Sequence, residues 1–531
     1  MAGSEDDGEW SPWEKEEEPE EREPLIPAVH GTGQIPRQNK FQQADSINSS
    51  MESHRSSSPI LGRSSPAKNV QYFTALSATM GALAMGTVLG FSSPAGPMLM
   101  SNATAGPVHL TKAQNSFFSS SMNLGALAGG PIGGMCLNKL GRRGTMLSSV
   151  VPFVGGWLLI AFAQNFSMLM AGRIITGFCA GITSLVVPTY IGEYASADIR
   201  GTLGSAFQLM VTIGVVYAYA IGAVVKTWQM LAGLCIIPAV IYFVMVFFTK
   251  ESPNFLLSKG KVDKASESLQ HFRGKDYNIQ TELNMLQQSV EDAKRNKASL
   301  KDLLKPYILK PLLISLTLMF FQQYSGVNPV LFNLNTIFED SGSTISDSIS
   351  SITIGVVQVL ATLLATVLMD RAGRKILLIV SASIMALSLT ALGEFFYEKM
   401  EDKTWAVETI GWLPLASLII FIAAFSIGYG PIPWLMMGEL FPSNVKEAAA
   451  GLATMVNWTL SFTITLIFVP LQDAIGDFGA YWLFAGVCVL NLIFCVTVVP
   501  ETKGKTLEEI SAYFGGPVVS SNSNSRHESD A

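Results

Sequence analysis

Long apolar segments, separated by short polar ones, fill most of the chain between about residues 70 and 500. A helix needs about 20 apolar residues to cross a bilayer. Twelve segments meet this requirement, in two sets of six with a charged stretch between them: 71–93, 115–138, 144–164, 168–190, 203–224 and 228–249, then 309–335, 350–369, 374–396, 412–437, 449–470 and 480–499. The pattern predicts an all-α membrane protein with twelve transmembrane helices in two six-helix halves.

The polar segments define the expected domain organisation. Residues 1–70 are too poor in apolar side chains to form a core, so they are expected to be a disordered cytoplasmic tail. The remaining expected parts are an N-terminal half at 71–249, a cytoplasmic linker with short helices at 250–308, a C-terminal half at 309–499, and a C-terminal tail at 500–531.

Composition supports the membrane assignment. Of the 531 residues, 49% are hydrophobic and 14% are charged, whereas a soluble domain carries about 25% charged residues. Positions 71–249 hold only nine charged residues in 179 positions. The net charge of −6 argues against nucleic-acid binding, and the five cysteines all lie in apolar stretches, where free thiols behave as small hydrophobes. We expect no metal site, no cofactor and no enzymatic activity, because the spans contain no histidine and no nucleophile–base pair.

The distribution of Lys and Arg among the loops predicts the orientation. If the N-terminus is cytoplasmic, most basic loop residues lie inside, and the C-terminus is then cytoplasmic as well. Asn102, in Asn102-Ala103-Thr104, falls in the first outer loop and is predicted to be glycosylated.

The N-terminal tail carries short candidate signals. Glu21, followed by Leu25 and Ile26, matches an acidic dileucine sorting motif that would bind a clathrin adaptor. The predicted residence is the plasma membrane, with endosomes or lysosomes as the alternative. Ser58 and Ser65 each precede proline and are candidate phosphorylation sites, where a phosphate would add negative charge.

The two halves repeat the same local motifs. Gly141-Arg142-Arg143 corresponds to Gly373-Arg374-Lys375, and Glu193 with Arg200 corresponds to Glu439 with Lys446. Glu251-Ser252 likewise corresponds to Glu501-Thr502. Internal repeats of this kind are typical of secondary transporters, whose substrate site lies between the halves.

The motifs also resemble a known family. Arg173 with Gly177 and Gly181, Pro188-x-Tyr190-x2-Glu193, Gln322-Gln323-x-Ser325-Gly326-x-Asn328, Gly430-Pro431-x-Pro433-Trp434 and Pro500-Glu501-Thr502-Lys503-Gly504 are similar to the sugar porter branch of the major facilitator superfamily. The resemblance covers roughly residues 70–515. Gly90-Phe91-Ser92-Ser93-Pro94 resembles facilitative hexose transporters of the intracellular type and facilitated trehalose transporters of arthropods.

A small neutral sugar needs amide groups that both donate and accept hydrogen bonds, and an aromatic face for its C–H side. Polar groups inside a bilayer are costly and therefore indicate function. The candidate sugar ligands are one tryptophan and six amides: Trp434, Gln208, Gln322, Gln323, Asn328, Gln358 and Asn457. The resemblance implies that they line a central site.

Two further groups of residues are candidates for conformational gating. Phe332 and Asn333 stand where many sugar porters carry two aromatic residues as an outer lid. Charged residues at the inner boundary could form ion pairs that hold the two inner faces together: Arg142, Arg143, Glu193, Arg200, Asp370, Arg371, Arg374, Glu439 and Lys446. Individual surface pairs contribute only about 0–1 kcal/mol, so the network as a whole would bias the equilibrium.

Departures from the family pattern leave alternatives open. Asn138, Gln229 and Asn254 replace charged residues, which would weaken the N-terminal gate. Proton-linked sugar porters carry an Asp in the first span, at a position matched here to Val88. We therefore expect a facilitative uniporter working without ATP. A proton-coupled symporter, with Glu394 as carrier, and a non-transporting sugar sensor are the alternatives. Trehalose, glucose and fructose all remain candidate substrates.

Overall fold

The computed structural model describes residues 68–101, 107–196, 198–295, 300–342, 346–441, 445–505 and 507–515. The predicted sorting, phosphorylation and glycosylation residues lie outside the described residues: Glu21, Leu25, Ile26, Ser58, Ser65 and Asn102.

The described part of the N-terminal half consists of helices. They are α2 (Lys68–Gly90), α3 (Ser92–Met100), α4 (Lys112–Ala161), α5 (Phe166–Tyr194), α6 (Arg200–Val224), α7 (Trp228–Leu234) and α8 (Ile236–Phe247). The segment that follows contains α9 (Pro253–Ser258), α10 (Val262–Arg273), α11 (Gln280–Arg295) and the 3-10 helix η1 (Leu300–Leu304).

The described part of the C-terminal half is helical as well. It comprises α12 (Pro306–Tyr324), α13 (Val327–Phe332), α14 (Leu334–Ser341), α15 (Asp347–Ala372), α16 (Arg374–Glu401), α17 (Lys403–Ile410), α18 (Leu413–Ile427), α19 (Ile432–Glu439), α20 (Lys446–Thr497) and α21 (Leu507–Tyr513).

The predicted twelve-helix architecture is confirmed, with differences at the span ends. Within the described residues, nine helical segments are long and apolar enough to cross a membrane. Two of them, α4 and α20, each contain two predicted spans joined across a glycine with positive φ, Gly141 at 85° and Gly476 at 78°. The span predicted at 309–335 is broken into α12, α13 and α14 and is not among the nine.

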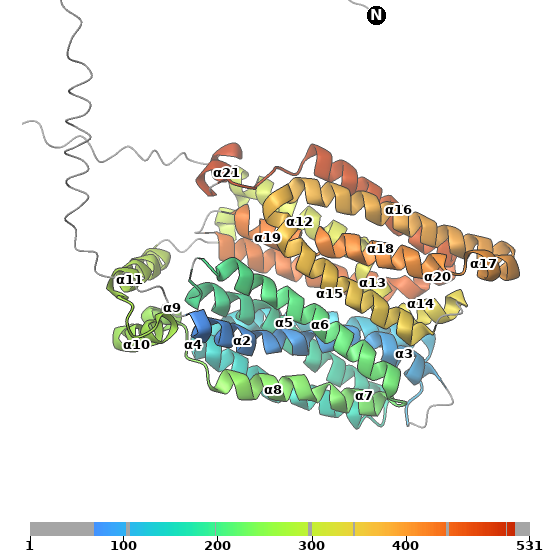
Figure 1. Ribbon diagram of the computed structural model, residues 1–531, viewed down its shortest axis with the longest axis horizontal. Helices are drawn as coiled ribbons and strands as arrows, with labels where there is room; N and C mark the ends of the chain where they lie inside the picture. Colours follow the sequence, from blue (N-terminus) through green and yellow to red (C-terminus); the bar gives the residue numbers. More distant parts are fainter. Residues whose placement is uncertain are drawn as a thin grey trace, which may run out of the picture. The chain divides into compact units, whose positions relative to one another are not determined.

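The two halves lie side by side with their helices roughly parallel (Figure 1). Helices α9–α11 and α21 lie at one end of the bundle, whereas α3, α7, α14 and α17 lie at the other. We call these the α9 end and the α17 end.

Direct hydrogen bonds between the halves lie at the α17 end and near the middle of the bundle. The Tyr219 hydroxyl in α6 donates to the Leu331 carbonyl at 2.9 Å. The backbone N–H of Asn335 in α14 donates to the Ser93 hydroxyl at 3.2 Å. The Ser116 hydroxyl near the start of α4 donates to the Leu466 carbonyl of α20 at 3.1 Å. The halves are therefore packed together at the α17 end in this conformation.

Candidate functional site

A break in the first helix of the C-terminal half lies next to the two buried glutamines, Gln322 and Gln323. Gly326 separates α12 from α13 with φ +83°, a conformation that favours glycine. A Cβ added there would lie 2.4 Å from the Phe484 ring, so the ring also requires glycine. The break places Gln322 and Gln323 in the last turn of α12 and Asn328 in the first turn of α13.

A second break separates α18 from α19. Pro433 has no backbone N–H, so it cannot donate to the carbonyl of Tyr429 four residues earlier. A carbonyl left free inside a bilayer needs another donor. Nε2 of Gln322 donates to the carbonyls of both Tyr429 and Gly430, each at 2.9 Å. The Gln322 side chain of α12 thus supplies the hydrogen-bond donor that the backbone lacks at the α18–α19 break.

Four amide side chains form one connected network from this point. Nδ2 of Asn457 in α20 donates to Oε1 of Gln322 at 2.8 Å, and Nε2 of Gln323 donates to Oδ1 of Asn457 at 3.1 Å. Nδ2 of Asn328 donates to Oε1 of Gln323 at 2.6 Å and to the Ser461 hydroxyl at 2.8 Å. The hydrogen bonds between the amides are all donated in one direction, from α13 towards the α18–α19 break. The network contains no charged group, and its remaining lone pairs suit a polyhydroxylated neutral ligand.

The other predicted sugar ligands are placed separately. Gln358 in α15 is buried, and its Oε1 has no hydrogen-bond partner among the described residues. Gln208 in α6 and Trp434 in α19 are half-buried. The structure thus brings Gln322, Gln323, Asn328 and Asn457 into direct contact but gives no hydrogen bond between them and Gln208, Gln358 or Trp434.

The predicted outer-lid residues sit in a tight turn. Phe332 is buried, and Nδ2 of Asn333 donates to the Pro329 carbonyl of its own helix at 2.8 Å. Asn333 therefore caps α13 in this conformation. The Tyr219 contact with Leu331 lies directly beside this turn and joins it to the other half.

A fully buried cation lies in the N-terminal half. Arg173 of α5 is 0% exposed and donates to the Val88 carbonyl at 2.9 Å and the Ser92 hydroxyl at 2.7 Å. The rings of Phe91 and Phe118 lie 5.7 and 5.1 Å from its guanidinium carbon, a cation–π arrangement. The side-chain partner of Arg173 on the first span is thus Ser92. Val88, which the sequence matched to the Asp of proton-linked sugar porters, contributes its backbone carbonyl. Each partner is neutral.

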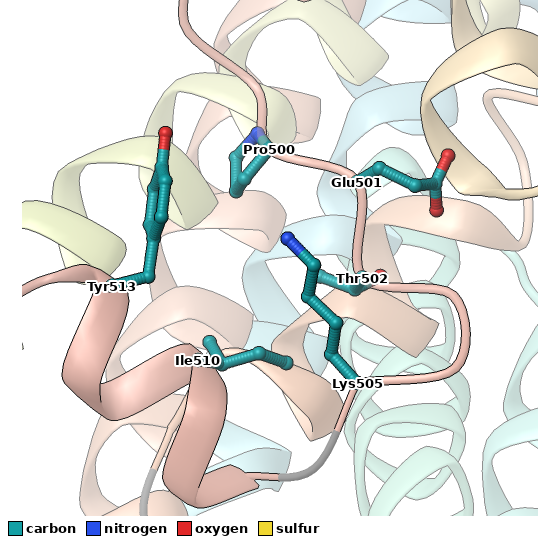
Figure 2. A pocket seen from close by; sticks show the side chains of 6 residues that line it. All are labelled: Pro500, Glu501, Thr502, Lys505, Ile510 and Tyr513. Carbon is teal, nitrogen blue, oxygen red and sulfur yellow. The ribbon is translucent and has the colours of Figure 1, made fainter. Parts of the chain in front are cut away.

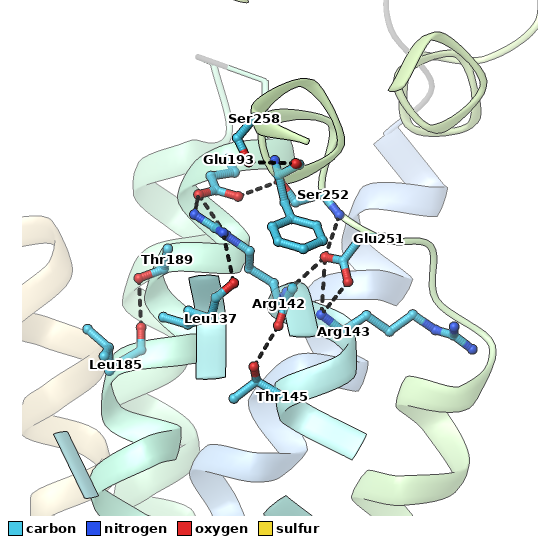
Figure 3. Close-up of polar contacts among 12 residues, drawn as sticks. Leu137, Arg142, Arg143, Thr145, Leu185, Thr189, Glu193, Glu251, Ser252 and Ser258 are labelled. Carbon is cyan, nitrogen blue, oxygen red and sulfur yellow. Dashed lines mark hydrogen bonds and ion pairs between the residues drawn. The ribbon is translucent and has the colours of Figure 1, made fainter. Parts of the chain in front are cut away.

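Arg142 anchors a polar cluster at the α9 end of the N-terminal half (Figure 3). Its Nε donates to the Glu193 carboxylate at 2.9 Å, and the Ser252 hydroxyl donates to the other oxygen of the same group. Glu251 accepts the backbone N–H groups of Arg142 and Arg143 at 2.9 and 3.1 Å. These are the first N–H groups after the Gly141 kink, where a helix N-terminus attracts an anion.

The C-terminal half repeats this cluster. Arg374 donates to Glu439 at 2.9 Å, and the Thr502 hydroxyl donates to Glu439 at 2.6 Å. Glu501 accepts the backbone N–H groups of Arg374 and Lys375, each at 3.0 Å. Burial raises the pKa of Glu501, but hydrogen bonds from the backbone N–H groups of Lys503, Arg374, Lys375 and Thr502 more than offset this effect, so the pKa lies below its usual value.

The segment after Glu501 packs against the last described helix. Ile510 and Tyr513 of α21 face Pro500 and Thr502 across a small pocket (Figure 2). The carboxylate of Glu501 points away from the other labelled side chains in this view, which matches its bonds to the N-terminus of α16.

The ion pairs differ from the predicted lock between the inner faces. Among the described residues, each pair of the clusters joins helices of one half, Arg142 with Glu193 and Arg374 with Glu439. The arginine and the glutamate of each pair belong to the same repeat, and the packing of its helices brings the two side chains together. Arg200 donates instead to the Ala195 carbonyl at 3.1 Å. Neither Arg371 nor Lys446 has an acidic partner among the described side chains, and Asp370 lies in α15 with a side chain outside the description.

Sequence reasoning missed Glu251, Ser252, Glu501 and Thr502 as members of these clusters. Their repetition at an offset of 250 residues was the available signal. The sequence also predicted that Gln229 belongs to the N-terminal gate at the inner boundary, and this prediction is wrong. Gln229 lies in α7 at the α17 end, because α6 begins beside the cluster and runs away from it (Figure 1). Asn254 lies beside the cluster in α9, and Asn138 is exposed.

Comparison with known proteins gives a consistent result. The family model described as "Sugar (and other) transporter" matches residues 67–514. The facilitated trehalose transporter Tret1 of Polypedilum vanderplanki is 42% identical over 450 residues, which cover 84% of this chain and 88% of the relative. Tret1 of Drosophila pseudoobscura pseudoobscura is 43% identical over 450 residues. That match covers 84% of this chain but 51% of the relative, so the chain spans about half the length of the Drosophila protein.

A solved structure shares the fold. The proton:xylose symporter XylE, solved bound to 6-bromo-6-deoxy-D-glucose, superimposes with a TM-score of 0.70 at 27% identity. The match covers 84% of this chain and 99% of that one.

Proposed function

The chain belongs to the sugar transporter family, and from that premise we propose that it carries a neutral sugar across a membrane by facilitated diffusion. The proposed substrate is trehalose or a hexose such as glucose. Support comes from relatives named as facilitated trehalose transporters and from the amide network at the helix breaks.

The chemistry of the network favours an uncharged polyol. Gln322, Gln323, Asn328 and Asn457 each offer both donors and acceptors, and none carries a charge. A sugar hydroxyl can replace an amide partner bond for bond, so binding does not strand a buried polar group. Gln358, with its unpartnered Oε1, and the half-buried Gln208 and Trp434 complete the proposed site.

Alternating access is the proposed mechanism. The two halves are joined at the α17 end in this conformation, so the site would open towards the α9 end. Each charged cluster ties helices within one half, which would let each half move as a rigid body. The basic residues of both clusters favour the α9 end as the cytoplasmic side, which would place both termini inside.

The proposal of uniport rests on the neutral environment of Arg173. Proton coupling requires a titratable group inside the membrane that exchanges partners during the cycle. Arg173 instead bonds a carbonyl and a hydroxyl, and the first described span offers it no carboxylate. The symporter alternative rests on the likeness to a proton:xylose symporter.

Uptake into proteoliposomes tests this proposal. We expect saturable uptake of radiolabelled trehalose or glucose that equilibrates without accumulating and does not respond to an inward proton gradient. Accumulation driven by the gradient would replace uniport by symport. Sugar-dependent protection against heat, without any uptake, would instead indicate a sensor.

A further inference from the structure

Three buried polar side chains on α4 lack partners for an oxygen. Asn115, Ser119 and Asn123 are 6%, 3% and 0% exposed. Oδ1 of each asparagine and the Ser119 hydroxyl have no hydrogen-bond partner among the described residues. Such groups are costly inside a membrane bundle. Since the three are spaced by four residues, they lie on one face of the helix.

A matching polar face on α20 lies opposite. Asn457, Ser461 and Thr465 are also spaced by four residues, and all three are buried. Nδ2 of Asn123 donates to the Thr465 hydroxyl at 3.1 Å, so the two faces meet. Ser116, on the same side of α4, donates to the Leu466 carbonyl at 3.1 Å.

The α20 face is continuous with the amide network. Asn457 belongs to that network, and Ser461 accepts a hydrogen bond from Asn328 at 2.8 Å. From Asn457 to Thr465 the helix rises about 12 Å, at 1.5 Å per residue. The polar surface therefore extends from the proposed sugar site towards the α17 end, over more than the length of one pyranose ring.

We propose that Asn115, Ser119 and Asn123 of α4, together with Ser461 and Thr465 of α20, form a second subsite that binds the second ring of a disaccharide. The amide network holds the first ring. The two faces pack together in this conformation and become accessible when the halves separate at the α17 end. The unpartnered oxygens then accept hydrogen bonds from the hydroxyls of the second ring.

This inference rests on the proposed transport function and specifies its substrate as a disaccharide. A hexose occupies only the site that the amide network forms with Gln358, Gln208 and Trp434, so it makes no contact with the polar face of α4. The subsite therefore predicts different effects on the two sugars, which a purely structural role for α4 does not.

The experiment compares KM values for trehalose and glucose in proteoliposomes. The variants are Ser119→Ala, Asn123→Ala and Thr465→Val; the last keeps the side-chain volume in case an asparagine variant fails to fold. Ser120→Ala is the matched control, because the Ser120 hydroxyl is already bonded to the Phe117 carbonyl at 3.1 Å.

We expect each test variant to raise the KM for trehalose about three- to ten-fold, the effect of one lost neutral hydrogen bond, and to leave the KM for glucose unchanged. The control should change neither. Equal changes for both sugars, or no change in any test variant, would overturn the subsite. Wild-type uptake of glucose but not trehalose would also overturn it while leaving sugar transport intact. Uptake of neither sugar would refute the proposed function itself.

Discussion

Replacement of Gln322 by leucine tests whether the amide network is both a structural link and a sugar site. Leucine has a similar volume but no polar atoms. The substitution removes three hydrogen bonds, those to the carbonyls of Tyr429 and Gly430 and the one from Asn457. It leaves two backbone carbonyls at the α18–α19 break without their donor.

The expected magnitude follows from these bonds. Hydrogen bonds between membrane helices contribute about 0.6 kcal/mol on average. Three of them sum to about 2 kcal/mol, which corresponds to about a thirtyfold change in an equilibrium constant. We therefore expect the Gln322→Leu variant to unfold at a lower temperature. Because the sugar loses its contacts to the same amide, KM should rise by at least about tenfold.

Two measurements separate these effects. Thermal unfolding of the purified protein without sugar reports the structural link, and its shift with added sugar reports binding. Uptake into proteoliposomes gives KM. Gln164→Leu is the control, because Gln164 is exposed in the loop before α5 and lies outside the site. An unchanged KM in a folded Gln322→Leu variant would refute the assignment of Gln322 as a sugar ligand.

Three further predictions concern other parts of the chain. Gly373→Ala should lower the melting temperature, because φ is +89° and the new Cβ would lie 2.7 Å from Glu501; Gly130→Ala, with open space around it, should not. The carboxylate of Glu501, which caps α16, should stabilise the protein less in acid. Because its pKa is lowered, this stabilisation is present at neutral pH and is lost as the pH falls through that pKa. Melting curves measured at several pH values should show this dependence in the wild type, and Glu501→Gln should abolish it. Ser92→Asp would set a carboxylate beside Arg173, so uptake should become pH dependent where the wild type is flat; a flat profile in this variant would contradict the role assigned to the neutral partner.

The sequence predicted the helical architecture because the bilayer imposes a simple rule on it. A span must be long and apolar, and the motifs of one half recur in the other, so both can be counted along the chain. The chemistry of the amides at 322, 323, 328 and 457 was also visible, since polar residues stand out in apolar segments.

Which partner each polar group takes depended on the packing of distant segments. The sequence expected ion pairs between the halves, but Arg142 meets Glu193 and Arg374 meets Glu439 inside their own halves. The position of Gln229 at the far end likewise follows from the direction of α6 and α7 in space.

The sequence by itself thus determined the number and order of the spans, the repeat and the polar residue types available for a sugar. Only the tertiary structure decided that Gln322 completes the α18–α19 break, that Ser92 faces Arg173, and that polar faces of α4 and α20 meet. The physical reason is that hydropathy and helical period act on neighbouring residues, whereas these hydrogen bonds join atoms more than 80 residues apart, and their short range makes them depend on how whole helices pack.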